Sequence, residues 1–205
     1  MSNAQSGKPY SRGHSSHNQD TTLTISYLIN GEDFFRACTL ASTWPSLETL
    51  ALTSPQLQPT RGRRSIFDLL HRAGTLALQT PKLRLLVLWM ATEDDACAFI
   101  YQAHHSHATI TWRGTWDLGL ESSVVDIWRN IGLQSGLSFY HAREKRIEEV
   151  ITCRGDGIHH LKSPCEVVTP ASLRQMRREG NTYQSEPYAE EPSPSITQNT
   201  VDSCF

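Results

Sequence analysis

The sequence predicts an α/β fold made of irregular strand–helix repeats, either a leucine-rich-repeat-like solenoid or a small, mainly parallel sheet. Residues 45–52 and 81–88 share the pattern P-x-L-x-x-L-x-L at an offset of 36 positions. Between them, residues 65–73 carry apolar side chains at i, i+3, i+4 and i+7, as an amphipathic helix does. Residues 108–112 then alternate apolar side chains with threonines, as a half-buried strand does. Repeated strand and helix in this order is typical of parallel α/β architectures.

The shared leucine pattern is that of the strand portion of a leucine-rich repeat. Leucines at the third, sixth and eighth positions turn into a core, and the intervening residues line the opposite face. The offset of 36 is longer than the usual repeat of about 20–29 residues. We therefore expect a degenerate and irregular version of that repeat.

The elements around the leucine segments follow from shorter patterns. Leu23, Ile25 and Tyr27 alternate with polar residues as a first strand, and residues 34–40 can form a short helix. Ser65 is the expected N-cap of the helix between the two leucine segments. Residues 94–101 begin with two aspartates and continue as an apolar run, which we interpret as a buried helix.

The second half of the sequence is expected to continue the alternation. Residues 123–131 begin with an acidic capping box and predict a helix. Val150 and Ile151 suggest a last strand, residues 155–157 (GDG) a tight turn, and residues 171–179 a basic closing helix. These elements give one α/β domain over residues 21–180. Residues 1–20 and 181–205 are polar and are expected to be disordered tails.

Composition limits the classes of partner. The formal charge of −2 comes from 19 basic and 21 acidic residues, and nucleic-acid binding usually needs a stronger basic bias. No stretch approaches the roughly 20 apolar residues of a membrane span. The five cysteines have no paired spacing, which favours a reducing compartment. We expect no nucleic-acid or membrane partner and an intracellular location, in the cytoplasm or the nucleus.

The predicted strands also suggest a surface for binding a partner protein. If the leucines turn inward, the residues between them share one exposed sheet face with the next strand. An exposed tryptophan beside arginine is a common anchor in protein interfaces. The candidate partner-binding residues are Arg84, Trp89, Thr109, Thr111 and Arg113. The alternative is a sheet covered on both faces, in which Leu85, Val87 and Trp89 lie buried under helices.

Two groups of residues could bind a metal ion. Cys153, His159, His160 and Cys165 are ligand types for zinc, but their C-x5-H-H-x4-C spacing matches no structural zinc pattern. The H-H-x-H group at residues 104–107 has neighbouring histidines that point in different directions, and a solvated loop is the simpler interpretation. Catalytic and phosphate-loop motifs are not found, so neither an enzyme nor a cofactor is expected.

Four segments, residues 111–118 (TWRGTWDL), 124–128 (VVDIW), 155–161 (GDGIHHL) and 173–179 (LRQMRRE), resemble a fungal domain of unknown function. In that family the domain often follows an F-box and degenerate leucine-rich repeats. The resemblance covers roughly residues 44–179. It implies a substrate-recognition part of an F-box protein, with a client of a ubiquitin ligase as one kind of partner. Residues 1–40 do not resemble an F-box.

Two hypotheses about function follow. The first is a non-catalytic protein–protein interaction module that binds a protein of unknown identity through a broad, shallow face. The second is a small enzyme or metal-binding accessory protein of a fungal metabolic pathway, in which the cysteines and histidines would converge on a pocket.

Overall fold

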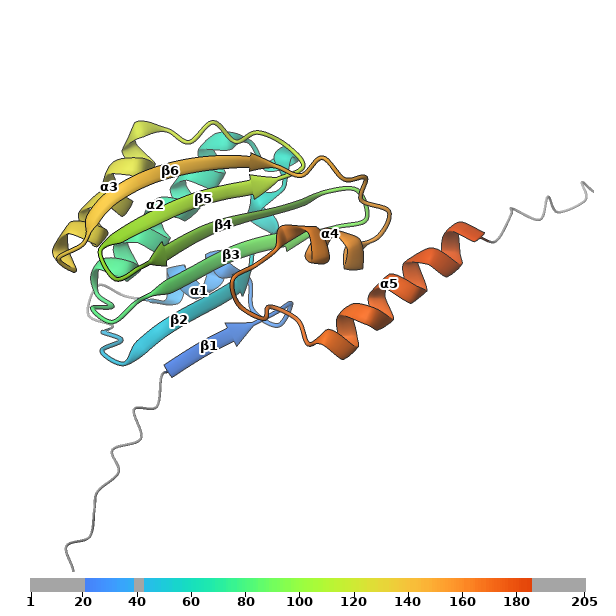
Figure 1. Cartoon of the computed structure of the whole chain (residues 1–205), viewed down its shortest axis with the longest axis horizontal. Coiled ribbons are helices and arrows are strands. Elements are labelled where there is room, and N and C mark those ends of the chain that lie inside the picture. Colours follow the sequence, from blue (N-terminus) through green and yellow to red (C-terminus); the bar gives the residue numbers. More distant parts are fainter. Residues whose placement is uncertain (1–20, 39–42, 186–205) are drawn as a thin grey trace, which may run out of the picture.

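The computed structural model describes residues 21–38 and 43–185 and shows a single mixed sheet of six strands (Figure 1). The strands lie side by side in sequence order: β1 (Thr21–Ile25), β2 (Leu47–Thr53), β3 (Leu85–Ala91), β4 (Ala96–Ala103), β5 (His107–Gly114) and β6 (Ser138–Arg146). The α-helices are α1 (Gly31–Ala37), α2 (Arg63–Leu78), α3 (Ser122–Gln134), α4 (Arg154–Leu161) and α5 (Pro170–Ser185). The expected α/β class is confirmed, in the form of a small sheet.

The two leucine segments form neighbouring parallel strands. β2 pairs with β3 so that Leu50 lies beside Leu86 and Leu52 beside Leu88, which is the offset of 36 seen in the sequence. All the leucines of the two patterns turn to one side of the sheet and are buried there: Leu47, Leu50, Leu52, Leu83, Leu86 and Leu88. The repeated pattern therefore reflects one repeated packing environment under a helix.

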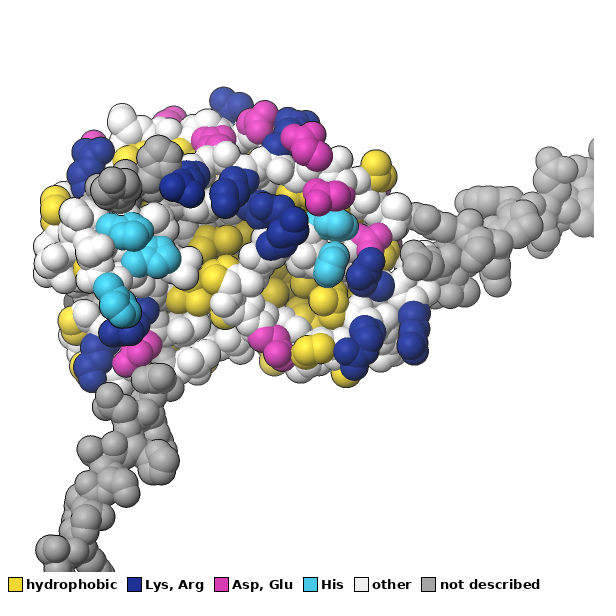
Figure 2. Space-filling view, in the orientation of Figure 1, with side chains coloured by type: hydrophobic (Ala, Val, Ile, Leu, Met, Phe, Trp, Pro, Cys, Tyr) yellow, Lys and Arg dark blue, Asp and Glu magenta, His cyan; other side chains and the backbone are white. Residues whose placement is uncertain are grey.

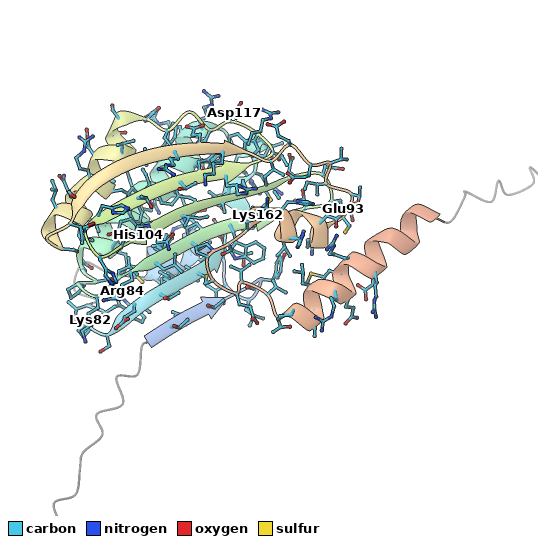
Figure 3. The ribbon with its side chains drawn as sticks, in the orientation of Figure 1. Lys82, Arg84, Glu93, His104, Asp117 and Lys162 are labelled. Atoms are coloured by element: carbon cyan, nitrogen blue, oxygen red, sulfur yellow. The ribbon has the colours of Figure 1, made fainter. Side chains whose placement is uncertain are left out.

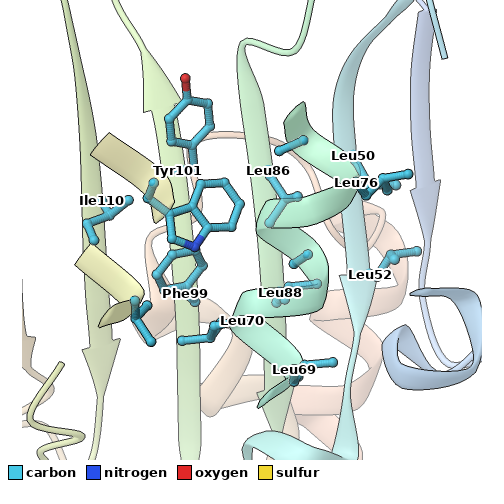
Figure 4. Packing of buried hydrophobic residues seen from close by; sticks show 14 of the residues in the cluster. Leu50, Leu52, Leu69, Leu70, Leu76, Leu86, Leu88, Phe99, Tyr101 and Ile110 are labelled. Atoms are coloured by element: carbon cyan, nitrogen blue, oxygen red, sulfur yellow. The ribbon is translucent and has the colours of Figure 1, made fainter. Parts of the chain in front are cut away.

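The helices α1, α2 and α3 cover that side of the sheet, which we call the helix face. The apolar stripe of α2 packs on the leucines of β2 and β3 (Figure 4). Trp128 of α3 contacts the rings of Phe99 and Tyr101. The predicted helices of residues 65–73 and 123–131 are confirmed. Ser65 is not the N-cap, because α2 begins two residues earlier and Gly62, with φ of 79°, is the capping residue.

The expected helix at residues 94–101 is wrong, because this segment is strand β4. Thr92 N donates to Asp95 O at 2.7 Å, and Asp95 N donates to Thr92 Oγ1 at 3.0 Å, which closes a tight turn. The acidic residues therefore belong to a hairpin between β3 and β4, which pair antiparallel. Since β4 is buried on both faces, its sequence lacks the alternation that identifies a strand.

The last strand is also not where the sequence suggested. Val150 and Ile151 lie in the connection to α4, while β6 runs parallel to β5 at the edge of the sheet. Its second half, residues 142–146 (AREKR), is polar and largely exposed. Charged side chains on an edge strand discourage edge-to-edge association, and they also remove the hydrophobic signal of a strand.

The C-terminal helices pack mainly on each other and on the second face of the sheet. Residues 155–157 belong to α4 and do not form the expected turn. The expected closing helix at residues 171–179 is confirmed as part of α5, and residues 181–185, expected in a tail, form its end. Arg177 Nε donates to Asp156 Oδ1 at 2.8 Å and joins the two helices.

The second face of the sheet carries its own, smaller core. Ala51, Val87, Trp89 and Ala98 are buried there with side chains of α4 and of the segment that follows it, among them Leu161 and Val167. Ser26 Oγ donates a hydrogen bond to Val167 O and ties this segment to the end of β1. In Figure 1 the segment crosses only one end of the sheet.

The expected disorder of residues 1–20 and of residues 186–205 lies outside the described residues. Within the described ranges, none of the helices has the length and apolar character needed to cross a membrane.

Candidate partner-binding surface

The half of the second sheet face that α4 leaves uncovered is the candidate site. The strand register places Thr49, Leu85, Gln102 and Thr109 in one row across β2 to β5. Thr111 stands in the next row, and all five are half-buried. Thr22 and Thr24 extend the rows onto β1 and are exposed. We call these seven residues the open face.

The open face has an apolar floor and a basic rim. Val87 and Ile100, in the same row as Thr111, are buried. Beside them, Arg143 pairs with Thr111 and Lys145 with Arg113, and both cations are exposed. Figure 2 shows lysine, arginine and histidine side chains around a hollow that is lined by hydrophobic side chains. The arrangement offers apolar contact in the centre and positive charge at the edge.

Arg113 is held at the boundary between the open face and α4. Its Nε donates to His160 O at 2.8 Å, and the side chain is half-buried. Glu149 lies near this group, with Oε1 at 3.5 Å from His160 Nδ1 and 4.0 Å from Lys162 Nζ. A hydrogen bond to its own backbone and the charges of His160 and Lys162 lower the pKa of the Glu149 carboxyl. Arg113 therefore anchors α4 and borders the open face.

Trp89 is not exposed, so the expectation of an exposed tryptophan beside arginine is wrong. The side chain is 0% exposed and meets the edge of the Tyr27 ring at 5.3 Å between centroids. Val87 is buried with it, while Leu85 is half-buried. The alternative of burial under a helix therefore holds for Trp89, because α4 returns to this face after the last strand.

Arg84 lies at the end of the sheet where β3 begins, one residue before that strand. Its N–H donates to Glu48 O at 2.8 Å, and its carbonyl accepts from Ala103 N at 2.7 Å. It lines a pocket of about 690 Å³ together with Lys82, His104 and His105, and we call this the edge pocket. Figure 3 shows Lys82, Arg84 and His104 at this end of the sheet. The expected binding residue Arg84 therefore lies next to the open face but is not one of its residues.

A second, smaller pocket lies at the carboxyl ends of β1, β2 and β3. It has a volume of about 250 Å³ and is lined by Tyr27, Asn30, Ser54 and Arg154, among others. Tyr27 has a φ of 62°, a left-handed conformation that is uncommon for an aromatic residue. Burial raises the pKa of its hydroxyl, and the Arg154 guanidinium partly opposes this. No pattern in the sequence pointed to this pocket.

The cysteine and histidine candidates for a metal do not converge. Cys153 is buried against α5, where a Cβ on Gly180 would lie 2.2 Å from the Cys153 Cβ. His159 is largely exposed, and partial desolvation together with the charge of the nearby Arg177 lowers its pKa. In residues 21–38 and 43–185, no group of three or more His, Cys, Asp or Glu side chains is placed to hold a metal ion.

The sequence reasoning missed part of the surface. Gln102 lies on β4, which the pattern assigned to a helix, and Arg143 lies on β6, which has no hydrophobic pattern. His104 and His105 were considered as metal ligands or as a solvated loop, and they line the edge pocket. The edge pocket could have been found from the sequence, because Lys82 and Arg84 precede the β3–β4 hairpin and His104 and His105 follow it.

Comparison with known proteins links the chain to a protein family. A family model described as "Family of unknown function (DUF6546)" matches residues 13–169. The match spans all six strands and α4 and ends just before Pro170, where α5 begins. Searches of curated proteins and of solved structures find no significant match.

Proposed function

Because the chain belongs to the family of unknown function DUF6546, we propose its function from its own surface: it is a non-catalytic module that binds a partner protein through the open face and its rim. The partner is a protein segment that carries both apolar and acidic side chains. The resemblance to domains that follow an F-box supports a client of a ubiquitin ligase as this partner. In that case the chain acts inside the cell.

The uneven cover of the sheet is the observation that carries the proposal. Three helices bury one face, whereas α4 and the segment after it bury only one end of the other. Sheets with parallel strands are normally covered on both faces. The uncovered half presents Leu85 among threonines and Gln102, a mixture of apolar and hydrogen-bonding groups that suits a protein interface.

The charges on the rim indicate the sign of the partner. Arg143 and Lys145 stand on the exposed edge strand, and Arg113 borders the covered end. Complementary charges at a rim mainly speed association and select among partners, while the apolar centre provides most of the affinity. An acidic partner segment with one or two apolar anchors fits both features.

The paired leucine strands support the resemblance to degenerate leucine-rich repeats, because both use parallel neighbouring strands with leucines turned to one side. A leucine-rich-repeat-like origin of the parallel half of the sheet is part of the proposal. Residues 1–40 do not resemble an F-box, so docking to a ligase is tested separately from client binding.

The test compares Thr111→Arg with Thr60→Arg. Thr111 is half-buried on the open face, and Thr60 is exposed beside α2 on the other side of the molecule. Tagged wild-type and variant proteins are expressed in their native cells with a proteasome inhibitor, and the proteins captured with each are quantified. A partner retained by Thr60→Arg and lost from Thr111→Arg supports the proposal. Equal capture by both variants contradicts it.

Scaffold subunits of a ubiquitin ligase in the same samples would support the adaptor form of the proposal. A partner recovered without scaffold would instead assign a stand-alone binding module. Far-ultraviolet circular dichroism and thermal unfolding of both variants check that the strand substitution has not unfolded the sheet.

A further inference from the structure

The edge pocket gathers basic side chains from two separate segments of the chain. Lys82 and Arg84 precede β3, and His104 and His105 follow β4. All four line the same pocket of about 690 Å³. The backbone hydrogen bond from Ala103 N to Arg84 O joins these two segments, and the one from Arg84 N to Glu48 O ties the first of them to the start of β2. The pocket is therefore built on strand ends rather than on a long loop.

Within residues 21–38 and 43–185, no ion pair neutralises the positive charge of Lys82 and Arg84. Both side chains are exposed. Glu48 is the one carboxylate among the residues that line the pocket. The His104 ring stacks on the His107 ring at 4.6 Å between centroids, which restricts its orientation. The pocket offers several nitrogen donors and a net positive charge.

We propose that the edge pocket binds the phosphate group of a phosphorylated segment in the partner protein. This inference rests on the proposed function and names the class of partner. A phosphoryl group carries a charge of about −1.5 to −2 and three acceptor oxygens. The Arg84 guanidinium can donate two parallel hydrogen bonds to it, Lys82 supplies a second charge, and the imidazoles donate further hydrogen bonds.

The position of the pocket favours a phosphorylated segment over a free phosphate ion. Glu48 and Arg84 directly precede Thr49 and Leu85, which begin the open face. A segment bound along the open face can therefore bring a phosphorylated side chain into the pocket at its end. A carboxylate has two oxygens, and it would leave more of the donors of these four side chains unpaired than a phosphate would.

The experiment measures the affinity of the full chain for two peptide pools by fluorescence polarisation. The pools have the same degenerate flanks and differ only in a central phosphoserine or serine. The protein is tested as wild type, as the Lys82→Gln, Arg84→Gln double variant, and as the Arg61→Gln, Arg72→Gln double variant. The last is the control for charge, because Arg61 and Arg72 are exposed near or on α2, away from the pocket.

We expect the wild type and the control to bind the phosphoserine pool about tenfold more tightly than the serine pool. The Lys82→Gln, Arg84→Gln variant should lose this preference. Equal binding of the two pools, or an equal loss in both double variants, would overturn the inference. A further outcome is that inorganic phosphate shifts the NMR signals of the pocket residues while the protein shows no preference for the phosphoserine pool. That result would overturn the inference too, because the site would then bind the free ion alone.

Failure of this inference can be separated from failure of the proposed function. Suppose that a captured partner is lost from Thr111→Arg, but that neither phosphatase treatment nor the Lys82→Gln, Arg84→Gln variant changes its capture. Binding at the open face is then supported, and recognition of a phosphate by the edge pocket is contradicted. If Thr111→Arg retains the partner, binding at the open face is contradicted, whatever the edge pocket binds.

Discussion

Trp89 shows how a single residue can satisfy a sequence pattern for binding and still belong to the core. Its side chain is fully buried between Tyr27 and the residues under α4. Its indole N–H has no acceptor among the described residues, which is a small cost against the large apolar area that the ring buries. Substitutions at Trp89 therefore report on stability and are poor tests of partner binding.

The burial of Trp89 leads to a prediction for its truncation. Trp89→Ala should lower the free energy of unfolding by about 3–5 kcal/mol, because it removes a large buried side chain and leaves a cavity. Trp89→Phe should cost much less, about 1.5 kcal/mol or under, since it keeps most of the ring and removes the unpaired donor. Urea unfolding measures both. A change below about 1 kcal/mol for Trp89→Ala would mean that the side chain is exposed.

Asp156 connects α4 to α5 and should make their packing sensitive to acid. Burial alone would raise the pKa of its carboxyl, but hydrogen bonds from Thr152 and Arg177 and the charge of Arg177 hold the pKa below its ordinary value. A lowered pKa in the folded state stabilises the protein above the pKa of the unfolded state, and this contribution is lost as the pH falls through the folded value.

The corresponding prediction compares the wild type with Asp156→Asn. At pH 7 the variant should be less stable by about 1 kcal/mol, a modest value because Arg177 is partly exposed. The difference should shrink below about pH 4, where the carboxyl of the unfolded chain becomes protonated, and it should be lost as the pH falls through the lower pKa of the folded state. Thermal unfolding between pH 3 and pH 7 measures it. A difference that stays constant over this range would show that the charge of Asp156 is not involved.

At the scale of elements, the sequence predicted those in which apolar residues recur at a regular spacing. The leucine pattern predicted two parallel neighbours, and the spacing of apolar residues predicted α2 and α3. β4 was misread because both of its faces are buried and its acidic turn resembles the start of a helix. β6 was missed because its edge position selects charged residues. Both errors come from neighbours that are distant in sequence.

The packing of α4 on α5 gives a prediction that opposes helix propensity. Alanine in place of glycine inside a helix normally stabilises it by up to about 1 kcal/mol. At Gly155, however, a Cβ would lie 2.6 Å from Arg177 Cγ and 2.8 Å from the Arg177 backbone nitrogen. Gly155→Ala should therefore destabilise the protein by about 1–3 kcal/mol, because α5 must move away.

Gly74→Ala is the matched comparison, measured by urea unfolding under the same conditions. The three atoms nearest to a Cβ added at Gly74 belong to the side chain of Ile127, with Cδ1 at 2.9 Å, and the end of that side chain can move. The substitution should be close to neutral. If Gly155→Ala were as well tolerated as Gly74→Ala, α4 and α5 would not be in close contact.

At the scale of the whole molecule, the uneven cover of the two sheet faces determines where a partner can bind. The smaller core joins residues as far apart as Ala51 and Val167, and no local pattern indicates that the chain after β6 returns to this face. Of the expected binding residues, Thr109 and Thr111 are on the open face, Arg113 is at its border, Arg84 is in the edge pocket and Trp89 is beneath α4. Strand alternation could predict the first two alone.

The most direct measurement is the affinity of the captured partner for purified wild type, Thr111→Arg and Thr60→Arg by isothermal titration calorimetry. We predict that Thr111→Arg weakens binding by at least about tenfold, because the longer side chain would occupy space on the open face that the partner needs, while Thr60→Arg leaves the affinity unchanged. Unchanged binding to a folded Thr111→Arg protein, or a loss confined to Thr60→Arg, would contradict binding at the open face.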